Sequence, residues 1–566
     1  MKTPVDVKEL MTWNWEDFAP AYQELEATPI HAANVESWLD GWSEAARLVD
    51  EFYNRAYVAT SVNTLDKDAE KTFEGFMQNI YPQAMQAEQR LKQKLLASGL
   101  QVRGFELQLR NMRSEAELFR ESNLPLEVEE QKLNTEHDKI MGAQTVEMDG
   151  EVKTQRQLEG MFWNPDRAIR ERAWNLMSQR QLADREAINA QWQQYMKLRL
   201  QIAKNADKPD YRAYRWQLNQ RFDYTPDDAK TLHDSIEKAV VPFTMRLAEK
   251  RRQRLGLKSL RYFDIYVDFR GSAALKPFKT TEELENGVAN AFAHVDPEFG
   301  KNFNELRAAG LLDTGNRPNK ASGAYCTTFA WTRSPFIFGN AVGINDDVRT
   351  LLHEGGHAMH DIETLNLRWH QQRNVPMEFN EVASMSMEML ASPYLLKEKG
   401  GFYTKQENAR SLLEQLELNV RFWPYMAIVD AFQHWVYENP LQGIDPTACD
   451  SKWMELEKRF RPYIDWSGAE EVMATGWHRK DHIHVAPFYY IEYGLAQLGA
   501  TQVWGNSLKD ERAAVQAYHS ALKLGGTATL PDIYKAAGAR LAFDTGTLGE
   551  AVALIESKMN ELEADL

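Results

Sequence analysis

The chain has 566 residues, of which 43% are hydrophobic and 11% aromatic, a composition typical of folded globular proteins and not of disordered ones. The formal net charge of −16 argues against nucleic acid as a partner, because that affinity depends on clustered lysine and arginine. The basic residues at 250–254 are interpreted as a solvated helix face. No run of about 18 apolar residues is present, so we expect no membrane partner.

The N-terminal segment and the cysteines favour a cytoplasmic location. The first 20 residues include acidic side chains and lack the apolar stretch of a secretory signal. The two cysteines, Cys326 and Cys449, are too few for a disulfide framework, which fits a reducing compartment. Cys326 is interpreted as a small hydrophobic residue, since no base for a nucleophile is near it in the sequence.

Helical spacing of apolar residues dominates from about residue 35 to 255. Asn164 before Pro165 predicts the start of one long helix. Between two short alternating runs, Asp149 and Gly150 predict a hairpin.

Strand-like composition returns at residues 260–269 and 323–344, where aromatic and β-branched residues mix with glycine. Helices are expected again from residue 347 onwards. A stretch of weak periodicity near residues 205–225 suggests a boundary. We therefore predict an N-terminal helical lobe at 1–205 and a catalytic region at 206–566, mainly α, with a small sheet just before the key helix.

Residues 353–357 read His-Glu-Gly-Gly-His, the H-E-x-x-H pattern. On a helix, His353 and His357 project from one face and can bind one metal ion, while Glu354 lies beside them to act on water. Asn345 or Asp346 is expected to cap this helix. Two adjacent glycines in mid-helix are costly, which indicates close approach of another backbone or of substrate.

A catalytic zinc needs a third protein ligand and an open position. The extended motif with a third histidine is absent, because His360 and Glu363 occupy its last two fixed positions. The next helix is predicted between Pro376 and Pro393, and it offers Glu378, Glu381 and Glu388. Glu381 lies inside this helix and is favoured over Glu378 as the ligand, and Glu388 is a candidate to orient a ligand. We expect one Zn2+ per chain, although similar ligands accept cobalt or manganese.

The sequence resembles the thimet oligopeptidase-like M3 metallopeptidases, and most closely their oligoendopeptidase F and Pz-peptidase branch. The resemblance rests on HEGGHAMH, EFNEVASMSMEML and HIHVAPFYYIEYGLAQLGA and covers about residues 200–560. It implies a two-lobed helical molecule of zincin type, with a deep channel that admits short peptides and excludes folded proteins. It also implies that His353, His357 and Glu381 bind zinc and that Glu354 is the general base.

The resemblance further implies a histidine and tyrosine cluster at the scissile carbonyl, matching His482, Tyr490 and Tyr493. His484 replaces His482 if the register shifts by two residues. Phenol and imidazole donors suit this place, because hydrolysis develops negative charge on the carbonyl oxygen. Tyr489 is interpreted as a core aromatic residue, and His434 as a core histidine.

The predicted function is zinc-dependent hydrolysis of internal peptide bonds in short peptides, with water activated by zinc and Glu354. The strand-like SGAYCTTFAW segment is a candidate to align an extended substrate through its backbone. An aminopeptidase is the first alternative, although no recognition element for a substrate amine is evident. A peptide-binding protein without activity and a structural zinc site are the others; neither needs Glu354. The oligomeric state stays open.

Overall fold

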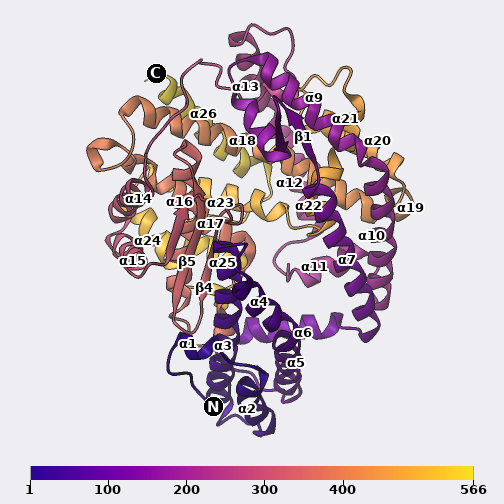
Figure 1. Ribbon diagram of the computed structural model, residues 1–566, viewed down its shortest axis with the longest axis vertical. Helices are drawn as coiled ribbons and strands as arrows, with labels where there is room; N and C mark the ends of the chain where they lie inside the picture. The colour runs from indigo at the N-terminus through magenta and orange to yellow at the C-terminus, as the bar shows by residue number, and fades with distance from the viewer. Residues whose placement is uncertain (1, 565) are drawn as a thin grey trace.

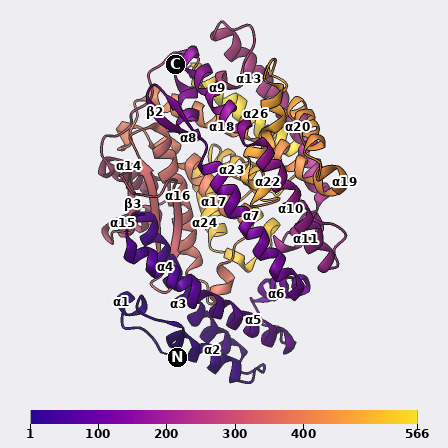
Figure 2. The same cartoon turned by 45° about the vertical axis from the view of Figure 1, so that its right-hand side comes forward.

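The computed structural model describes residues 2–564 and 566, and it is built mainly of α-helices (Figure 1). The predicted mainly α fold is thereby confirmed. In Figures 1 and 2 the N-terminal helices α1–α5 project from the lower end of the molecule, and α16, α17 and α23 lie in its middle. Among the described residues, no helix has an apolar stretch sufficient to span a membrane.

The N-terminal helices share a core of their own, to which the distant residue Trp369 contributes. Their bounds are α1 (Val7–Leu10), α2 (Trp15–Ala27), α3 (Val35–Val62), α4 (Lys67–Asn79), α5 (Tyr81–Ala97) and α6 (Glu106–Leu118). A larger core begins at Leu118 and continues to Met559. The predicted division at residues 205 and 206 stays a prediction, and the two buried clusters separate at about residues 112–118.

The predicted hairpin around Asp149 and Gly150 is confirmed. Its strands are antiparallel, and both turn residues have positive φ, 58° and 79°, as a tight two-residue turn requires. The elements of this part are η1 (Glu121–Asn123), where η marks a 3₁₀ helix, α7 (Leu124–Gly142), β1 (Thr145–Met148), β2 (Glu151–Thr154), α8 (Gln155–Gly160), η2 (Met161–Trp163), α9 (Arg167–Ala183), α10 (Arg185–Asn205) and α11 (Tyr211–Leu218).

The strand predicted at residues 260–269 is wrong, since this segment is a loop around η3 (Tyr262–Asp264). The buried Asp264 carboxylate accepts hydrogen bonds from Arg167 and Arg170 of α9, at 3.0 and 2.9 Å. The apolar residues of the segment at 260–269 include three that are buried at alternate positions, Phe263, Ile265 and Val267. The alternation of this segment therefore reflects packing of a loop.

The strands predicted within residues 323–344 are present and form part of a three-stranded sheet. The edge strand β4 (Tyr325–Phe329) pairs antiparallel with β5 (Ser334–Ala341), with Cys326 opposite Ile337. The parallel strand β3 (Leu312–Gly315) on the other side of β5 was not predicted. Both β4 and β5 pack against α16 (Asn345–Thr364), so the predicted sheet beside the key helix is confirmed.

Two helix starts differ from the prediction. Helix α9 begins at Arg167, and Asp166 caps it by accepting from the Ala168 N–H. Helix α16 is capped by neither Asn345 nor Asp346; instead the Asp347 carboxylate accepts the N–H groups of residues 342–344. Each helix is thus capped by an acidic residue one or two positions further along than expected.

The remaining helices form the bulk of the larger core. Before α16 these are α12 (Pro226–Ala239), α13 (Val241–Arg254), α14 (Thr281–Val295) and α15 (Pro297–Ala308). After it come η4 (His370–Arg373), α17 (Met377–Ala391), η5 (Ser392–Tyr394), η6 (Lys397–Lys399), α18 (Lys405–Glu438), α19 (Pro440–Gly443) and α20 (Pro446–Phe460). The C-terminal part contains α21 (Glu470–Ala474), η7 (Thr475–Arg479), α22 (Asp481–His484), α23 (Ile491–Ser507), α24 (Glu511–Leu522), η8 (Gly525–Thr527), α25 (Leu530–Ala536) and α26 (Thr545–Ala564). Helix α17 lies between α16 and α23 and packs against both.

Candidate active site

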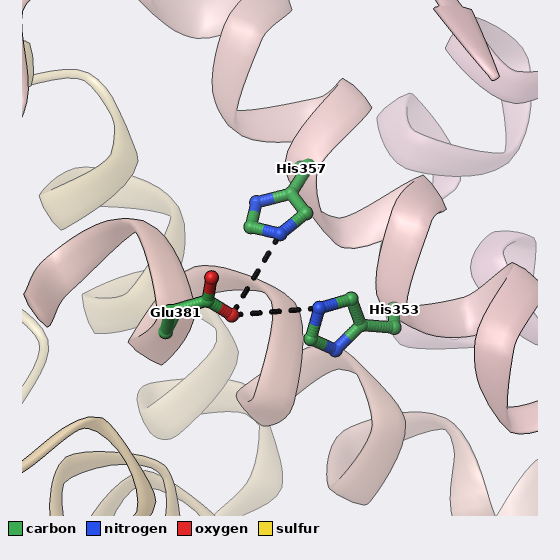
Figure 3. Close-up of side chains that lie close together, drawn as sticks. All are labelled: His353, His357 and Glu381. Atoms are coloured by element: carbon green, nitrogen blue, oxygen red, sulfur yellow. Dashed lines mark ion pairs between the residues drawn. The ribbon is translucent and has the colours of Figure 1, made fainter. Parts of the chain in front are cut away.

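Three potential metal ligands meet where α16 packs against α17. Figure 3 shows the imidazoles of His353 and His357, both on α16, pointing at the Glu381 carboxylate on α17. The Glu381 Oε2 atom is 3.4 Å from His353 Nε2 and 3.8 Å from His357 Nε2. Bonds of about 2 Å from these atoms to one zinc ion are compatible with such separations. The arrangement is a three-ligand set on two adjacent helices.

The two glycines of the motif explain how the helices approach so closely. A Cβ atom at Gly356 would lie 2.8 Å from the Cα atom of Ser384 on α17. A Cβ atom at Gly355 would lie 2.5 Å from the ring of Phe292 on α14. The predicted approach of another backbone is therefore confirmed at Gly356, whereas Gly355 makes room for a side chain. Both close contacts are possible only because glycine has no Cβ atom.

Two of the three ligands have the protonation state that metal binding needs. Burial alone would lower the pKa of His353, but its hydrogen bonds with Glu381 and Glu388 raise it well above the usual value, so a bound metal would displace a proton from this imidazole. Burial lowers the pKa of His357 to about 4, so its imidazole is neutral near pH 7, the form that binds a metal. Burial alone would raise the pKa of the Glu381 carboxyl, but its hydrogen bond with His353 and the imidazole charges lower it below its usual value. Glu388 on α17 contacts His353 Nδ1 at 2.7 Å and accepts from Gln415 at 2.9 Å. This contact fixes which ring nitrogen of His353 faces Glu381.

Glu354 lies beside the ligands with its carboxylate on the side of the sheet. It accepts a hydrogen bond from the backbone N–H of Cys326 in β4. Burial raises the pKa of Glu354 to about 7, a value at which a carboxyl group takes up and releases protons near neutral pH. Burial and the nearby carboxylates of Asp361 and Glu354 raise the pKa of the Cys326 thiol, so it is not an activated nucleophile.

The histidine and tyrosine cluster lies at residues 482–493, a segment that runs from α22 through the connecting residues into the first turn of α23 and is here named the loop at residues 482–493. The ring of His482 is 5.6 Å from that of Tyr489, 4.8 Å from Tyr490 and 6.1 Å from Tyr493, measured between centroids. Burial lowers the pKa of His482 to about 4, with Lys480 adding to the effect, so its imidazole is neutral at pH 7. The alternative His484 is fully buried and stacks on His137 at 4.4 Å, among side chains of α7 and α10.

The tyrosines divide into two kinds. Burial raises the pKa of Tyr493 to about 12, and the charges of Glu381 and Glu354 contribute, so this phenol lies near the ligand set. Tyr489 is half-buried, shares a hydrogen bond with Tyr493 and also senses the charge of Glu381. Tyr490 is only 7% exposed, and the Lys480 amine lies 3.9 Å from its ring centroid.

Tyr489 is the residue that the sequence interpretation treated as core and that the structure brings beside Tyr493. The spacing of four between Tyr489 and Tyr493 is the signal that was passed over, because it places two side chains on one face across the start of α23. Glu378, the alternative third ligand, instead accepts from the Tyr224 hydroxyl at 2.7 Å. His434 is buried as expected, with its ring 3.3 Å from Asp430.

A second group of potential ligands lies away from this site. His519 on α24 is within 3.3 Å of Asp296 and 3.9 Å of Glu298. Its Nε2 atom already contacts Glu363 at 2.8 Å, and Glu298 is exposed. The set at His353, His357 and Glu381 is the better fit to zinc, because it offers two imidazoles and a buried acid, whereas the second group offers one imidazole.

Comparisons with known proteins identify the family and the fold of the chain. The family model described as peptidase family M3 matches residues 161–551. Oligopeptidase PepF of Bacillus subtilis (strain 168) is 23% identical over 337 residues, which are 59% of this chain and 49% of PepF. The chain thus spans about half the length of that relative.

Two solved structures superpose over nearly the whole chain. Pz peptidase A with inhibitor 2 has a TM-score of 0.84 at 24% identity and covers 99% of this chain and 98% of its own. A putative oligoendopeptidase F has a TM-score of 0.84 at 25% identity, with the same coverage. The resemblance inferred from the sequence motifs is therefore confirmed. With two thirds of its length matched by the family model, this chain belongs to peptidase family M3.

Proposed function

We propose that the chain is a zinc-dependent oligoendopeptidase, which hydrolyses internal peptide bonds of short peptides. The observation that carries the proposal is the meeting of His353, His357 and Glu381 beside Glu354, whose carboxylate is held against the edge strand β4. A three-ligand set leaves a position open for water or substrate, as catalytic zinc sites do and structural sites do not. Related proteins named oligopeptidase and oligoendopeptidase support the same reaction class.

One zinc ion per chain would be held by His353, His357 and Glu381. When bound, zinc supplies Lewis acidity, which lowers the pKa of water and polarises a carbonyl group. Glu354 removes a proton from the attacking water and delivers it to the leaving amine. Its pKa of about 7 suits both transfers. The hydrogen bond from the Cys326 N–H fixes the orientation of the Glu354 carboxylate, which would otherwise rotate freely.

We assign the stabilisation of the developing oxyanion to His482 and Tyr493, with Tyr489 as the neighbour that orients Tyr493 through their shared hydrogen bond. Both His482 and Tyr493 keep their protons near pH 7 in the neutral donor form. Tyr490 was expected in the same role; its burial and its contact with His482 favour a supporting position behind that imidazole.

The edge of β4 is proposed to align an extended substrate by backbone hydrogen bonds. Part of this edge is already used, because Asn54 donates to the Thr328 carbonyl at 3.2 Å and Glu354 accepts from Cys326. A cavity of about 350 Å³ is lined by Gly323, Ala324 and Glu354, so the start of the strand faces open space beside the base. Replacing substrate amides by esters is expected to weaken binding, and unchanged binding contradicts this alignment.

The function is tested with quenched fluorescent peptides of about five to forty residues. Internal cleavage of the short members is expected, with loss of activity on chelation and recovery on adding zinc. Cleavage that removes one residue at a time from the N-terminus would show an aminopeptidase instead. Zinc binding with no cleavage at any length would show a peptide-binding protein and overturn the proposal.

A further inference from the structure

The loop that carries His482, Tyr489 and Tyr493 is held by arginines that lie more than 260 residues earlier in the chain. Arg199 on α10 donates to two carbonyls, those of Ile483 at 3.1 Å and of His484. Arg215 on α11 donates to the Pro487 carbonyl at 3.3 Å, and Arg221 after α11 donates to that of Phe488. Four carbonyls within six residues thus accept from three guanidinium groups, here named the arginine clamp: Arg199, Arg215 and Arg221.

Two of the three arginines are buried, and each is fixed by a carboxylate on its other side. Arg199 is fully buried and contacts Glu130 of α7 at 2.7 Å. Arg221 is 6% exposed and contacts Glu492 of α23 at 2.6 Å. Burying a guanidinium is costly unless its donors are paired. At Arg199 the pairing is completed by the two loop carbonyls, and at Arg221 a single nitrogen, Nη2, donates to both the carboxylate and the Phe488 carbonyl. The position of each arginine and the path of the loop are therefore fixed together.

The loop needs such support, because its backbone is strained at one position. Phe488 has φ of 64°, in the left-handed region that residues other than glycine rarely adopt. Its N–H donates to Gln433 at 2.7 Å, and its carbonyl accepts from Arg221. Its ring is fully buried and packs against Trp216. A strained conformation persists where the surroundings determine it from several sides.

The strained residue immediately precedes Tyr489, which bonds to Tyr493. We propose that Arg199, Arg215 and Arg221 are positioning residues, which hold the loop so that His482 and the tyrosines face the metal ligands. The inference rests on the proposed function, because it assigns the loop its place in the reaction. Release of a carbonyl lets the backbone at Phe488 relax, and Tyr489 turns away from Tyr493. Misplacement of catalytic groups by about 1 Å can cost about 100-fold in rate.

Arg215→Met is the sharpest variant, because Arg215 is the half-buried member of the clamp. Its matched control is Arg212→Met, one turn earlier on α11, since Arg212 pairs with the Glu438 side chain and not with the loop. We expect Arg215→Met to lower kcat about tenfold with KM within about twofold, and Arg215→Lys to recover most of the loss. Arg212→Met should keep kcat within about twofold.

Hydrogen exchange at residues 482–493 supplies a readout independent of catalysis. Arg215→Met and Arg221→Lys should exchange faster there, at unchanged zinc content, while Arg212→Met exchanges as the native protein does. Unchanged kcat and exchange in Arg215→Met overturns the clamp, and so does an equal loss in Arg212→Met. If the native protein cleaves no peptide, the proposed function fails, and with it the positioning role; exchange then decides only whether the arginines hold the loop.

Discussion

The pair of helices α16 and α17 and the loop at residues 482–493 bring functional side chains to one place by different means. On the helices, His353 and His357 are placed by a spacing of four residues, and Gly356 allows α17 with Glu381 to approach. On the loop, the position of the tyrosines depends on backbone carbonyls, which accept hydrogen bonds from Arg199 and from other arginines of distant helices. The first arrangement is local in sequence, and the second is not.

This difference predicts how each region responds to substitution. Regular helices tolerate change away from their contacts, because their backbone is satisfied within the helix. A loop with strained φ and externally bonded carbonyls has no such reserve. Substitutions at α16 and α17 should therefore act through named side chains, whereas substitutions around the loop should act through its position.

The largest effect is expected from Glu354→Gln, which tests the helical region directly. Glutamine keeps the shape and the hydrogen bond from Cys326 but takes no proton, so kcat should fall about 1000-fold. Zinc content, measured by metal analysis, should equal that of the native protein. A fully active variant would remove Glu354 from the mechanism and leave the helix pair without its base.

The tyrosines of the loop provide the next test. Tyr493→Phe removes a phenol that lies near Glu381 and Glu354, and kcat should fall about 100-fold. Tyr490→Phe is the matched control, since Tyr490 is buried away from that surface, and its kcat should stay within about threefold. Steady-state kinetics on one peptide compares the two. A larger loss in Tyr490→Phe reverses the assignment.

Glu388→Ala separates metal affinity from the chemical step. Without the contact at Nδ1, the His353 imidazole loses its orientation, and zinc affinity should fall about 10- to 100-fold. Competition with a fluorescent chelator measures the affinity. Activity at saturating zinc should return towards the native value, and a variant that binds zinc normally contradicts the contact's role.

Gly356→Ala tests the close packing of α16 on α17. The new methyl group would lie 2.8 Å from the Ser384 Cα, so the free energy of unfolding should fall by about 1–3 kcal/mol. Gly75→Ala in α4 is the control, because no atom lies within 4 Å of the added methyl group. That variant should gain up to about 1 kcal/mol from helix propensity. Denaturant titration measures the change in the free energy of unfolding for both variants. A change of the same sign in both would contradict the close packing at Gly356.

The last effect concerns acid stability near the loop. Burial lowers the pKa of His478 to about 3, and its ring contacts Asn189 of α10 at 2.9 Å. As pH falls below 6.5, the unfolded chain binds a proton that the folded chain does not. The free energy of unfolding should therefore decrease towards acid pH, by up to about 1.4 kcal/mol per pH unit for this histidine.

His478→Gln removes this titration while keeping polar atoms for Asn189. Its stability should depend less steeply on pH between 6.5 and about 4, by about one proton. Denaturant titrations at several pH values check the slope. An unchanged slope would show that His478 is not held neutral in the folded protein, and the burial of this region would need revision.

The sequence predicted those features that depend on neighbours along the chain. The H-E-x-x-H spacing, the helix between Pro376 and Pro393 and the hairpin turn at Asp149 are all local patterns, and each was found. The strand at residues 260–269 was wrong, because alternation alone does not show whether a partner strand exists. Strand β3 was missed for the converse reason, since four residues beside β5 carry little pattern.

The active site divides along the same line. The position of Glu381 inside the helix after Pro376 was enough to favour it over Glu378. Apart from the spacing of four between Tyr489 and Tyr493, nothing local distinguishes Tyr489 from Tyr490, and their different burial arises just after the left-handed backbone at Phe488. That backbone depends on Arg221 and Gln433, whose contacts cross 267 and 55 residues of sequence. Long-range contacts of this kind are visible only in the folded structure.

Anomalous diffraction at the zinc absorption edge, from crystals of the zinc-loaded protein, tests the central claim most directly. The account predicts one strong peak per chain, bonded at about 2 Å to His353, His357 and Glu381, with Glu354 outside bonding distance. A peak at Asp296 and His519 in its place, or Glu354 bound as a ligand, would contradict the proposed metal centre.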